Sequence, residues 1–372
     1  MAEGQTALEV KYAENSQNAK YIRQFIPKQM FIKTQYLLSR WIFLMIISLI
    51  LSCQAEIPSR KLNGISLVAS RDSLTAQQIE PLIAVNANSV ALMPFGFLRD
   101  TEDPELYFNL ERQWFGERAE GIEQAILLLK ERNLKIIVKP QIWIRGGEFT
   151  GDLKFTSEAD WKKFERSYRE FILLYAKIAE KNKVELFCIG TELFNFVKAR
   201  PEFWDSLIAE VRKEFNGKIV YAENWDKVDQ TTIWKDLDYI GADAYFPLHD
   251  AASPNKDEIK DGWQKHKSML KNLSSEYHKP VLFTEYGYRN IDHSLREPWN
   301  SERNISSLNH NLQAKALESI YEEFWVENWF AGGFLWKWHQ HEDSGGLEND
   351  RFTPQNKPAE NTVKDYYGKF RN

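Results

Sequence analysis

The chain contains little cysteine, with only Cys53 and Cys188 in 372 residues. Two cysteines are too few for a disulfide framework or a cysteine-rich metal cluster. Their settings also differ. Cys188 lies in an apolar run, where a thiol packs as a small hydrophobe, whereas Cys53 ends a hydrophobic segment. The fold is therefore expected to depend neither on disulfides nor on a cysteine-bound metal.

The chain also lacks the marks of a nucleic-acid or nucleotide partner. Its net charge is −5 and it has no run rich in Lys and Arg, which argues against nucleic acid. No Gly-x-Gly-x-x-Gly follows the first predicted strand, which counts against nucleotide binding. No internal repeat or low-complexity linker follows residue 61, so residues 62–372 are predicted to form one domain.

Long hydrophobic runs are scarce as well. The apolar run at residues 41–51 is too short to span a bilayer, but it fits the apolar part of a secretory signal, with Lys33 and Arg40 before it. Residues 50–53, Ile-Leu-Ser-Cys, resemble a bacterial lipoprotein signal, in which the cysteine is lipidated. We therefore expect an exported cell-envelope lipoprotein, held at a membrane through Cys53. A plain signal peptide and a short retained anchor are the alternatives.

The first residues are set apart from the folded domain. Residues 1–29 are polar and place the apolar run unusually far from the chain start, and Met30 would be a more typical signal start. Residues 1–61 are assigned to this extension, the signal segment and a short tether. The folded domain is assigned to residues 62–372.

Apolar and aromatic residues are plentiful, at 43% and 14% of the chain, which is ample for a large core. The thirteen Trp suggest flat apolar faces that a sugar ring can stack on. Eight segments have the composition of buried strands: 64–69, 89–95, 135–143, 185–193, 218–224, 238–245, 281–285 and 330–338. Helical spacing predicts helices at 75–85, 120–132, 157–181, 201–215, 257–277, 311–323 and 358–370.

This alternation predicts an α/β fold with a parallel sheet. Eight strand–helix units favour closure into a (β/α)₈ TIM barrel, which usually takes about 250 residues, with loop insertions making up the excess. The link between the fifth and sixth strands is short and weakly helical. A doubly wound open sheet is the alternative.

Two glutamates end predicted strands in similar surroundings. Glu192 follows Thr191 at the end of the fourth strand, and Glu285 follows Thr284 at the end of the seventh. Alternation along the strand predicts that Glu192 shares a face with Gly190 and Cys188. Chemistry in such barrels is placed at the carboxyl ends of the strands, and a carboxylate there is costly to bury without a purpose.

Two carboxyl groups that face each other across a barrel mouth are typical of enzymes that hydrolyse glycosides. One protonates the leaving oxygen, while the other attacks the anomeric carbon or activates water; a separation of about 5 Å gives retention. The structural alternative is that each Glu pairs with a neighbouring Arg or Lys. Two strand-end glutamates on strands four and seven favour catalysis over that alternative.

Several short motifs along the chain resemble those of a known family of enzymes. The chain is similar to retaining (β/α)₈ glycoside hydrolases with the acid/base on strand four and the nucleophile on strand seven, above all to family 113 β-mannanases. The resemblance rests on residues 63–66, 139–143, 190–192, 242–245, 284–288, 334–336 and 352–359. It implies that Glu192 is the acid/base and Glu285 the nucleophile in the cleavage of β-1,4-mannosidic linkages. Thr191 stands where most of the wider clan has an Asn for the sugar 2-hydroxyl.

Five further residues are predicted to bind substrate. Tyr245 is expected to hydrogen-bond Glu285, Trp336 to lie under the cleaved sugar, and Asn224 to bind a hydroxyl. Gln141 and Trp143 share a face of the third strand and are expected to supply a polar contact and a stacking wall. Each aromatic residue could instead belong to the core.

No cofactor or metal is expected. Residues 339–343, His-Gln-His-Glu-Asp, resemble a metal site on first inspection, but two His two residues apart are weak evidence, and a role at the cleft rim is favoured. Arg71 and Asp72 are also expected to line the mouth. Two rival functions stay open: the same chemistry on another β-glycan such as a glucan, and a non-catalytic carbohydrate-binding barrel at the cell surface. Loops 96–118 and 289–310 would decide between endo and exo action.

Overall fold

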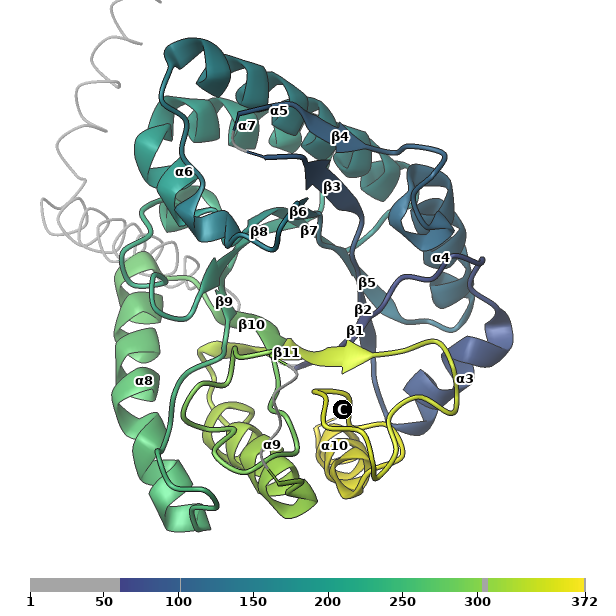
Figure 1. Ribbon diagram of the computed structural model, residues 1–372, viewed down its shortest axis with the longest axis vertical. Helices are drawn as coiled ribbons and strands as arrows, with labels where there is room; N and C mark the ends of the chain where they lie inside the picture. Colours follow the sequence, from purple (N-terminus) through teal and green to yellow (C-terminus); the bar gives the residue numbers. More distant parts are fainter. Residues whose placement is uncertain (1–60, 101, 303–306, 371–372) are drawn as a thin grey trace, which may run out of the picture. The chain divides into compact units, whose positions relative to one another are not determined.

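The structure is a computed structural model that describes residues 61–100, 102–302 and 307–370. Eight parallel strands close into a barrel, because β1 pairs with β2 on one side and with β11 on the other (Figure 1). These strands are β1 (Leu62–Leu67), β2 (Ser89–Leu92), β5 (Lys135–Val138), β7 (Leu186–Thr191), β8 (Lys218–Asn224), β9 (Ile240–Asp243), β10 (Val281–Tyr286) and β11 (Phe330–Trp338). The predicted TIM barrel is confirmed, and the open-sheet alternative is wrong.

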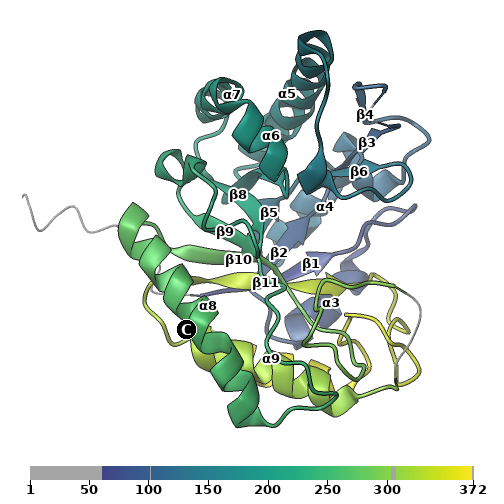
Figure 2. The same cartoon turned by 60° about the vertical axis from the view of Figure 1, so that its left-hand side comes forward.

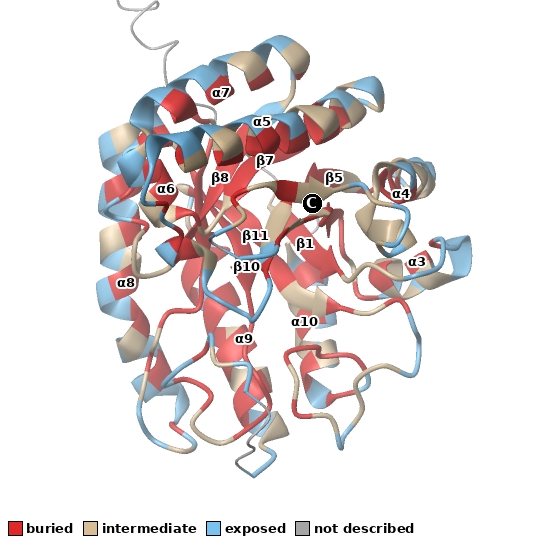
Figure 3. Cartoon of the chain, turned by 45° about the horizontal axis from the view of Figure 1, so that its top comes forward, coloured by how far each residue is buried: buried red, intermediate tan, exposed pale blue. Residues whose placement is uncertain are grey.

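Helices surround the barrel and turn their apolar sides towards it (Figure 3). They are α3 (Ala76–Ala84), α4 (Ala119–Glu131), α5 (Glu158–Lys181), α6 (Phe194–Ala199), α7 (Pro201–Glu214), α8 (Lys256–Tyr277), α9 (His310–Phe324) and α10 (Pro358–Lys369). The Ser157 hydroxyl caps α5 by accepting the Asp160 N–H, and Pro201 occupies the first turn of α7. The short link between β8 and β9 carries a 3₁₀ turn at Ile233–Asp236. The sequence did not predict α6.

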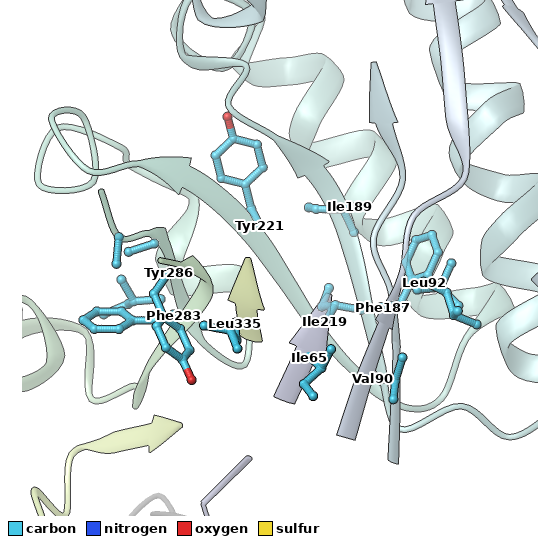
Figure 4. Close-up of a cluster of buried hydrophobic side chains, with 14 of the residues drawn as sticks. Ile65, Val90, Leu92, Phe187, Ile189, Ile219, Tyr221, Phe283, Tyr286 and Leu335 are labelled. Atoms are coloured by element: carbon cyan, nitrogen blue, oxygen red, sulfur yellow. The ribbon is translucent and has the colours of Figure 1, made fainter. Parts of the chain in front are cut away.

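Two apolar clusters result from the alternation of side chains along the strands. The outer cluster lies between strands and helices and includes Ile65, Val90 and Phe187 (Figure 4). The inner cluster fills the barrel and includes Leu186 and Cys188. Phe187 thus faces the helices while its two neighbours face the interior, as a period of two requires. The Cys188 thiol packs as a small buried side chain, as predicted.

Two predicted strands are broken rather than continuous. The segment 89–95 divides into β2 and β3 (Phe95–Leu98), and the segment 135–143 divides into β5 and β6 (Gln141–Ile144). The breaks fall at Pro94 and Pro140, which lack the N–H that a central strand must donate. Together with β4 (Leu106–Phe108), β3 and β6 form a separate three-stranded sheet (Figure 2). Because β3 and β6 directly follow barrel strands, this sheet extends the carboxyl-end rim.

Candidate active site

Glu285 lies near the carboxyl end of β10 and is 6% exposed. Strict alternation would turn it outwards with Phe283, which packs in the outer cluster. The register between β10 and β9 shifts between Phe283 and Glu285, so that Glu285 aligns with Asp243. Such an irregularity redirects a side chain, and here it turns the Glu285 carboxylate towards the barrel mouth.

Three donors bind the Glu285 carboxylate. The Tyr245 hydroxyl donates to Oε2 at 2.7 Å, and the Gln141 amide donates to Oε1 at 2.8 Å. The Lys139 ammonium also donates to Oε1, at 2.5 Å. The predicted hydrogen bond from Tyr245 is therefore confirmed. Donors on both oxygens fix the plane of the carboxylate and suit its ionised form.

The ion-pair network beneath Glu285 was not predicted from the sequence. The Lys139 ammonium is fully buried and lies 3.2 Å from each Asp243 oxygen, and the Thr284 hydroxyl donates to Asp243 at 2.7 Å. Burial lowers the pKa of Lys139, but the charges of Asp243 and Glu285 outweigh it and raise that pKa above its usual value. Burial and the charge of Glu285 raise the pKa of Asp243 to about 7, although Lys139 opposes this. The available signal was one Lys and one Asp, each within an apolar segment.

Glu192 directly follows β7 and takes a left-handed backbone conformation, with φ of 51°. The Glu192 N–H donates to the carbonyl of Ala222 at 2.7 Å, and the Thr150 hydroxyl donates to the Glu192 carbonyl at 3.1 Å. Burial, followed by the charges of Asp243 and Glu285, raises the pKa of Glu192 well above its usual range. Two carboxyls with such different environments can act as acid and as nucleophile.

One detail of the Glu192 prediction was wrong. Gly190 does not share an inward face with Cys188, because the register between β7 and β8 shifts between Cys188 and Thr191. A Cβ on Gly190 would point towards the Tyr168 hydroxyl, at 2.7 Å, which lies in the outer cluster. Thr191 turns inwards instead, with its hydroxyl 4.0 Å from the Cys188 sulfur. Period-two alternation fails wherever a strand carries such an irregularity.

Glu223 is a second buried acid that the sequence analysis did not single out. Its oxygens accept the N–H of Asn224 at 2.9 Å and the hydroxyl of Thr231 at 2.8 Å. Burial raises its pKa to about 7. The neighbouring Tyr221 hydroxyl accepts the N–H of Leu193 at 2.7 Å, which fixes the backbone beside the acid/base candidate. A Glu within the apolar run 219–223 was the signal for this group.

Glu192 and Glu285 line one hollow of about 990 Å³, here called the catalytic hollow. The structure places Asn224, Tyr245 and Trp336 around the same space, as predicted. The Asn224 Oδ1 accepts the N–H of Trp225, which fixes the amide at the end of β8. The Trp225 ring stacks on exposed Trp299, with centroids 5.1 Å apart, and both rings line the hollow.

Gln141 and Trp143 lie elsewhere than predicted. They belong to β6, outside the barrel, and line an adjoining hollow of about 910 Å³, here called the middle hollow. This hollow meets the catalytic hollow at three shared residues, Trp336, Lys337 and His339. Gln141 still reaches Glu285, because β6 continues directly from β5. Arg71, Asp72 and the start of the 339–343 segment line the middle hollow, as predicted for rim residues.

The remaining expectations concern a metal site, a membrane span and the N-terminal segment. Within those residues, no three His, Cys, Asp or Glu side chains form a group that could hold a metal ion. The described helices include none that is both long and apolar enough to cross a membrane. Cys53 and the apolar run 41–51 lie outside the described residues, and the division of the chain at residue 61 stays a prediction.

The fold has close counterparts among solved structures. A GH113 β-mannanase from Alicyclobacillus acidocaldarius, solved with ManMIm, superposes with a TM-score of 0.73 at 22% identity, over 85% of this chain and 99% of that one. A GH113 β-1,4-mannanase gives a TM-score of 0.71 at 24% identity, over 83% and 99%. A β-D-glucuronidase of Dictyoglomus thermophilum gives 0.56 at 15% identity, over 83% of this chain but 51% of its own.

A comparison with curated proteins found no match. The model of glycoside hydrolase family 113, in contrast, matches residues 69–357, which include the barrel from β2 to β11 and every candidate active-site residue. This match agrees with the barrel and with the two carboxyls at its mouth. The chain belongs to glycoside hydrolase family 113.

Proposed function

We propose that the chain is a retaining β-mannanase that cleaves β-1,4-mannosidic linkages in mannan or manno-oligosaccharides. The observation that carries this proposal is the contrast between two carboxyls in one hollow. Glu285 accepts hydrogen bonds from three donors, whereas the pKa of Glu192 is raised well above its usual range. Family membership and the β-mannanase structures that share the fold support the substrate class.

In the first step, Glu285 attacks the anomeric carbon and the bond to the leaving oxygen breaks, while Glu192 gives its proton to that oxygen. The product is a glycosyl ester on Glu285. Esterification removes the charge of Glu285, which is one cause of the raised pKa of Glu192, so that pKa falls. Glu192 then takes a proton from water, which attacks the anomeric carbon and releases Glu285.

The Lys139–Asp243 pair has a clear part in this cycle. When Glu285 becomes an ester, the buried Lys139 ammonium keeps the Asp243 carboxylate as its partner. The ammonium is therefore not left as an uncompensated buried charge in the intermediate, which would be costly. Tyr245 and Gln141 hold the carboxylate plane in line for attack.

The test is incubation with mannan, cellulose and xylan oligomers, with product analysis and NMR of the first-formed anomer. Mannan cleavage with the β-anomer first is expected. Cleavage of glucan alone would support the alternative substrate, and binding without cleavage would support the non-catalytic barrel. A 2-deoxy-2-fluoro-mannosyl fluoride should label the peptide that contains Glu285. The Glu285→Ala and Glu192→Ala variants should lose turnover and stay folded; full activity in either would contradict its role.

We also propose that the protein is exported and held in the cell envelope by a lipid on Cys53. The support is the apolar run 41–51, too short to span a bilayer, followed by the lipoprotein-like residues 50–53. Expression in a bacterial host with an alkyne-labelled fatty acid tests this proposal. The full chain should carry the label in the membrane fraction, and the Cys53→Ala variant should lose it. Label that persists in the variant would contradict the proposal.

A further inference from the structure

The rim sheet carries a third hollow, of about 580 Å³, that no candidate role explains. It meets the middle hollow at three shared residues, Trp114, Glu117 and Trp143. Since the middle hollow also meets the catalytic hollow, the three hollows adjoin one another in a row, here called the groove, which begins at the candidate catalytic carboxyls. A volume of this size is within the usual range for a small-ligand site.

Three arginines line this third hollow, and we call it the arginine hollow. Arg99 follows β3 and Arg145 follows β6, two strands that pair in parallel with Leu98 opposite Ile144. Arg112 comes from the segment after β4. Three separate segments thus bring guanidinium groups to one edge of the sheet, while the chain as a whole carries a net charge of −5. Local charge opposite to the net charge is a property of binding sites for anions.

The three arginines differ in whether another group of the protein already compensates their charge. Arg99 lies 3.8 Å from Asp103 and stacks over the Tyr107 ring at 4.5 Å. Arg112 and Arg145 are exposed, and neither has an ion-pair partner within residues 61–100, 102–302 and 307–370. Glu117 is the acid among the lining residues and lies where the hollow meets its neighbour. Two guanidinium groups are therefore available to a carboxylate, which they bind in a bidentate manner.

Aromatic side chains provide the apolar wall that a sugar ring needs. Trp114 and Trp143 are 42% and 46% exposed, so both rings are partly accessible to a ligand, and the Arg71 guanidinium lies 5.8 Å from the Trp114 ring centroid. The Phe97 ring supports Trp143 in an edge contact, with centroids 6.1 Å apart. Exposed indole rings beside guanidinium groups combine stacking with recognition of a negative charge.

We propose that the arginine hollow binds a carboxylate-bearing sugar, a hexuronic acid carried by the glycan whose backbone lies in the catalytic hollow. This proposal rests on the proposed function, because the groove would hold one chain along its whole length. The glycan would then be an acidic heteropolysaccharide rather than a purely neutral mannan. The uronate carboxylate would lie against Arg112 and Arg145, and the sugar ring would stack on Trp143.

Calorimetric titration of the full chain with two hexasaccharides tests this proposal. One is β-1,4-mannohexaose, and the other is the same hexaose with the primary hydroxyl of one terminal mannose oxidised to a carboxylate. The Glu285→Gln substitution in every protein prevents turnover during the titration. The double variant Arg112→Gln/Arg145→Gln should bind the oxidised hexaose about tenfold more weakly, the loss expected for two solvent-accessible ion pairs. Its affinity for the neutral hexaose should not change.

The matched control is Arg166→Gln/Lys213→Gln, which removes two exposed positive charges from α5 and α7, and it should bind both ligands as the parent does. An equal loss in the control, or equal weakening for both ligands, would overturn the proposal. Binding of the oxidised hexaose alone would support the hollow while contradicting the mannanase assignment. Binding of the neutral hexaose alone would do the reverse, and binding of neither would contradict both.

Discussion

Removal of the Lys139 ammonium is expected to be the most informative single change. The side chain is fully buried and contacts the carboxylates of Asp243 and Glu285, so Lys139→Met leaves both without their cation. Removing one partner of a buried ion pair costs about 3–5 kcal/mol, because the remaining charge stays buried. A loss of this size is large beside a total stability of about 5–15 kcal/mol, and it should lower Tm by roughly 10 °C.

The deficit should depend on pH in a defined direction. Asp243 already has a pKa of about 7, raised by burial and by Glu285, and Lys139 holds it lower than it would otherwise be. Without Lys139 that pKa rises further, and the folded variant binds a proton more readily than the folded parent does. The variant therefore regains stability relative to the parent as pH falls, so the difference is largest above pH 7 and shrinks in acid.

Urea unfolding of parent and variant across this pH range measures the difference. Lys177→Met is the control, because Lys177 pairs with Glu214 at the surface, where such pairs contribute about 1 kcal/mol or less. Adding Asp243→Asn to Lys139→Met should restore part of the stability, since it removes the uncompensated charge. A deficit below 1 kcal/mol, or one that does not change with pH, would refute the reasoning.

Three further predictions concern the same site. Tyr245→Phe removes the 2.7 Å hydrogen bond to Glu285, so kcat should fall about ten- to a hundredfold in initial-rate assays while Tm changes little. Glu192→Gln should lose most turnover, and its residual activity should lack the alkaline limb of the parent's pH–rate profile, where activity declines as pH rises through the raised pKa of this acid; an unchanged limb would contradict the assignment. Gly190→Ala should destabilise the fold by about 1–3 kcal/mol in urea unfolding, because the added Cβ would lie 2.7 Å from the Tyr168 hydroxyl.

Local sequence was sufficient for the fold and for most of its elements. Apolar runs and helical spacing predicted all eight barrel strands and seven of the helices, because burial on both faces leaves a clear composition in each strand. The same patterns did not predict the breaks at Pro94 and Pro140, although a missing donor N–H in a central strand is readable from sequence. Those two prolines would have predicted that each strand breaks there, but not that β3 and β6 pair with each other and β3 with β4.

The candidate active site, like the elements of the fold, was only partly predictable from local sequence. Glu192 and Glu285 were readable because each ends an apolar strand, and Tyr245 because it follows another. Lys139 and Asp243 are 104 positions apart, and only closure of the barrel brings their charges within 3.2 Å. Their pairing was therefore not visible in either local segment.

By itself, the sequence determined the barrel, the two strand-end carboxyls and the resemblance to family 113, because these depend on local composition and short motifs. The tertiary structure decided which way the carboxyls point, since register shifts in β7 and β10 override the alternation of side chains. It also decided what surrounds them. The Lys139 network and the raised pKa of Glu192 depend on groups from distant segments, which meet only when the barrel closes. The arginine hollow depends instead on the pairing of β3 with β6 in the separate three-stranded sheet.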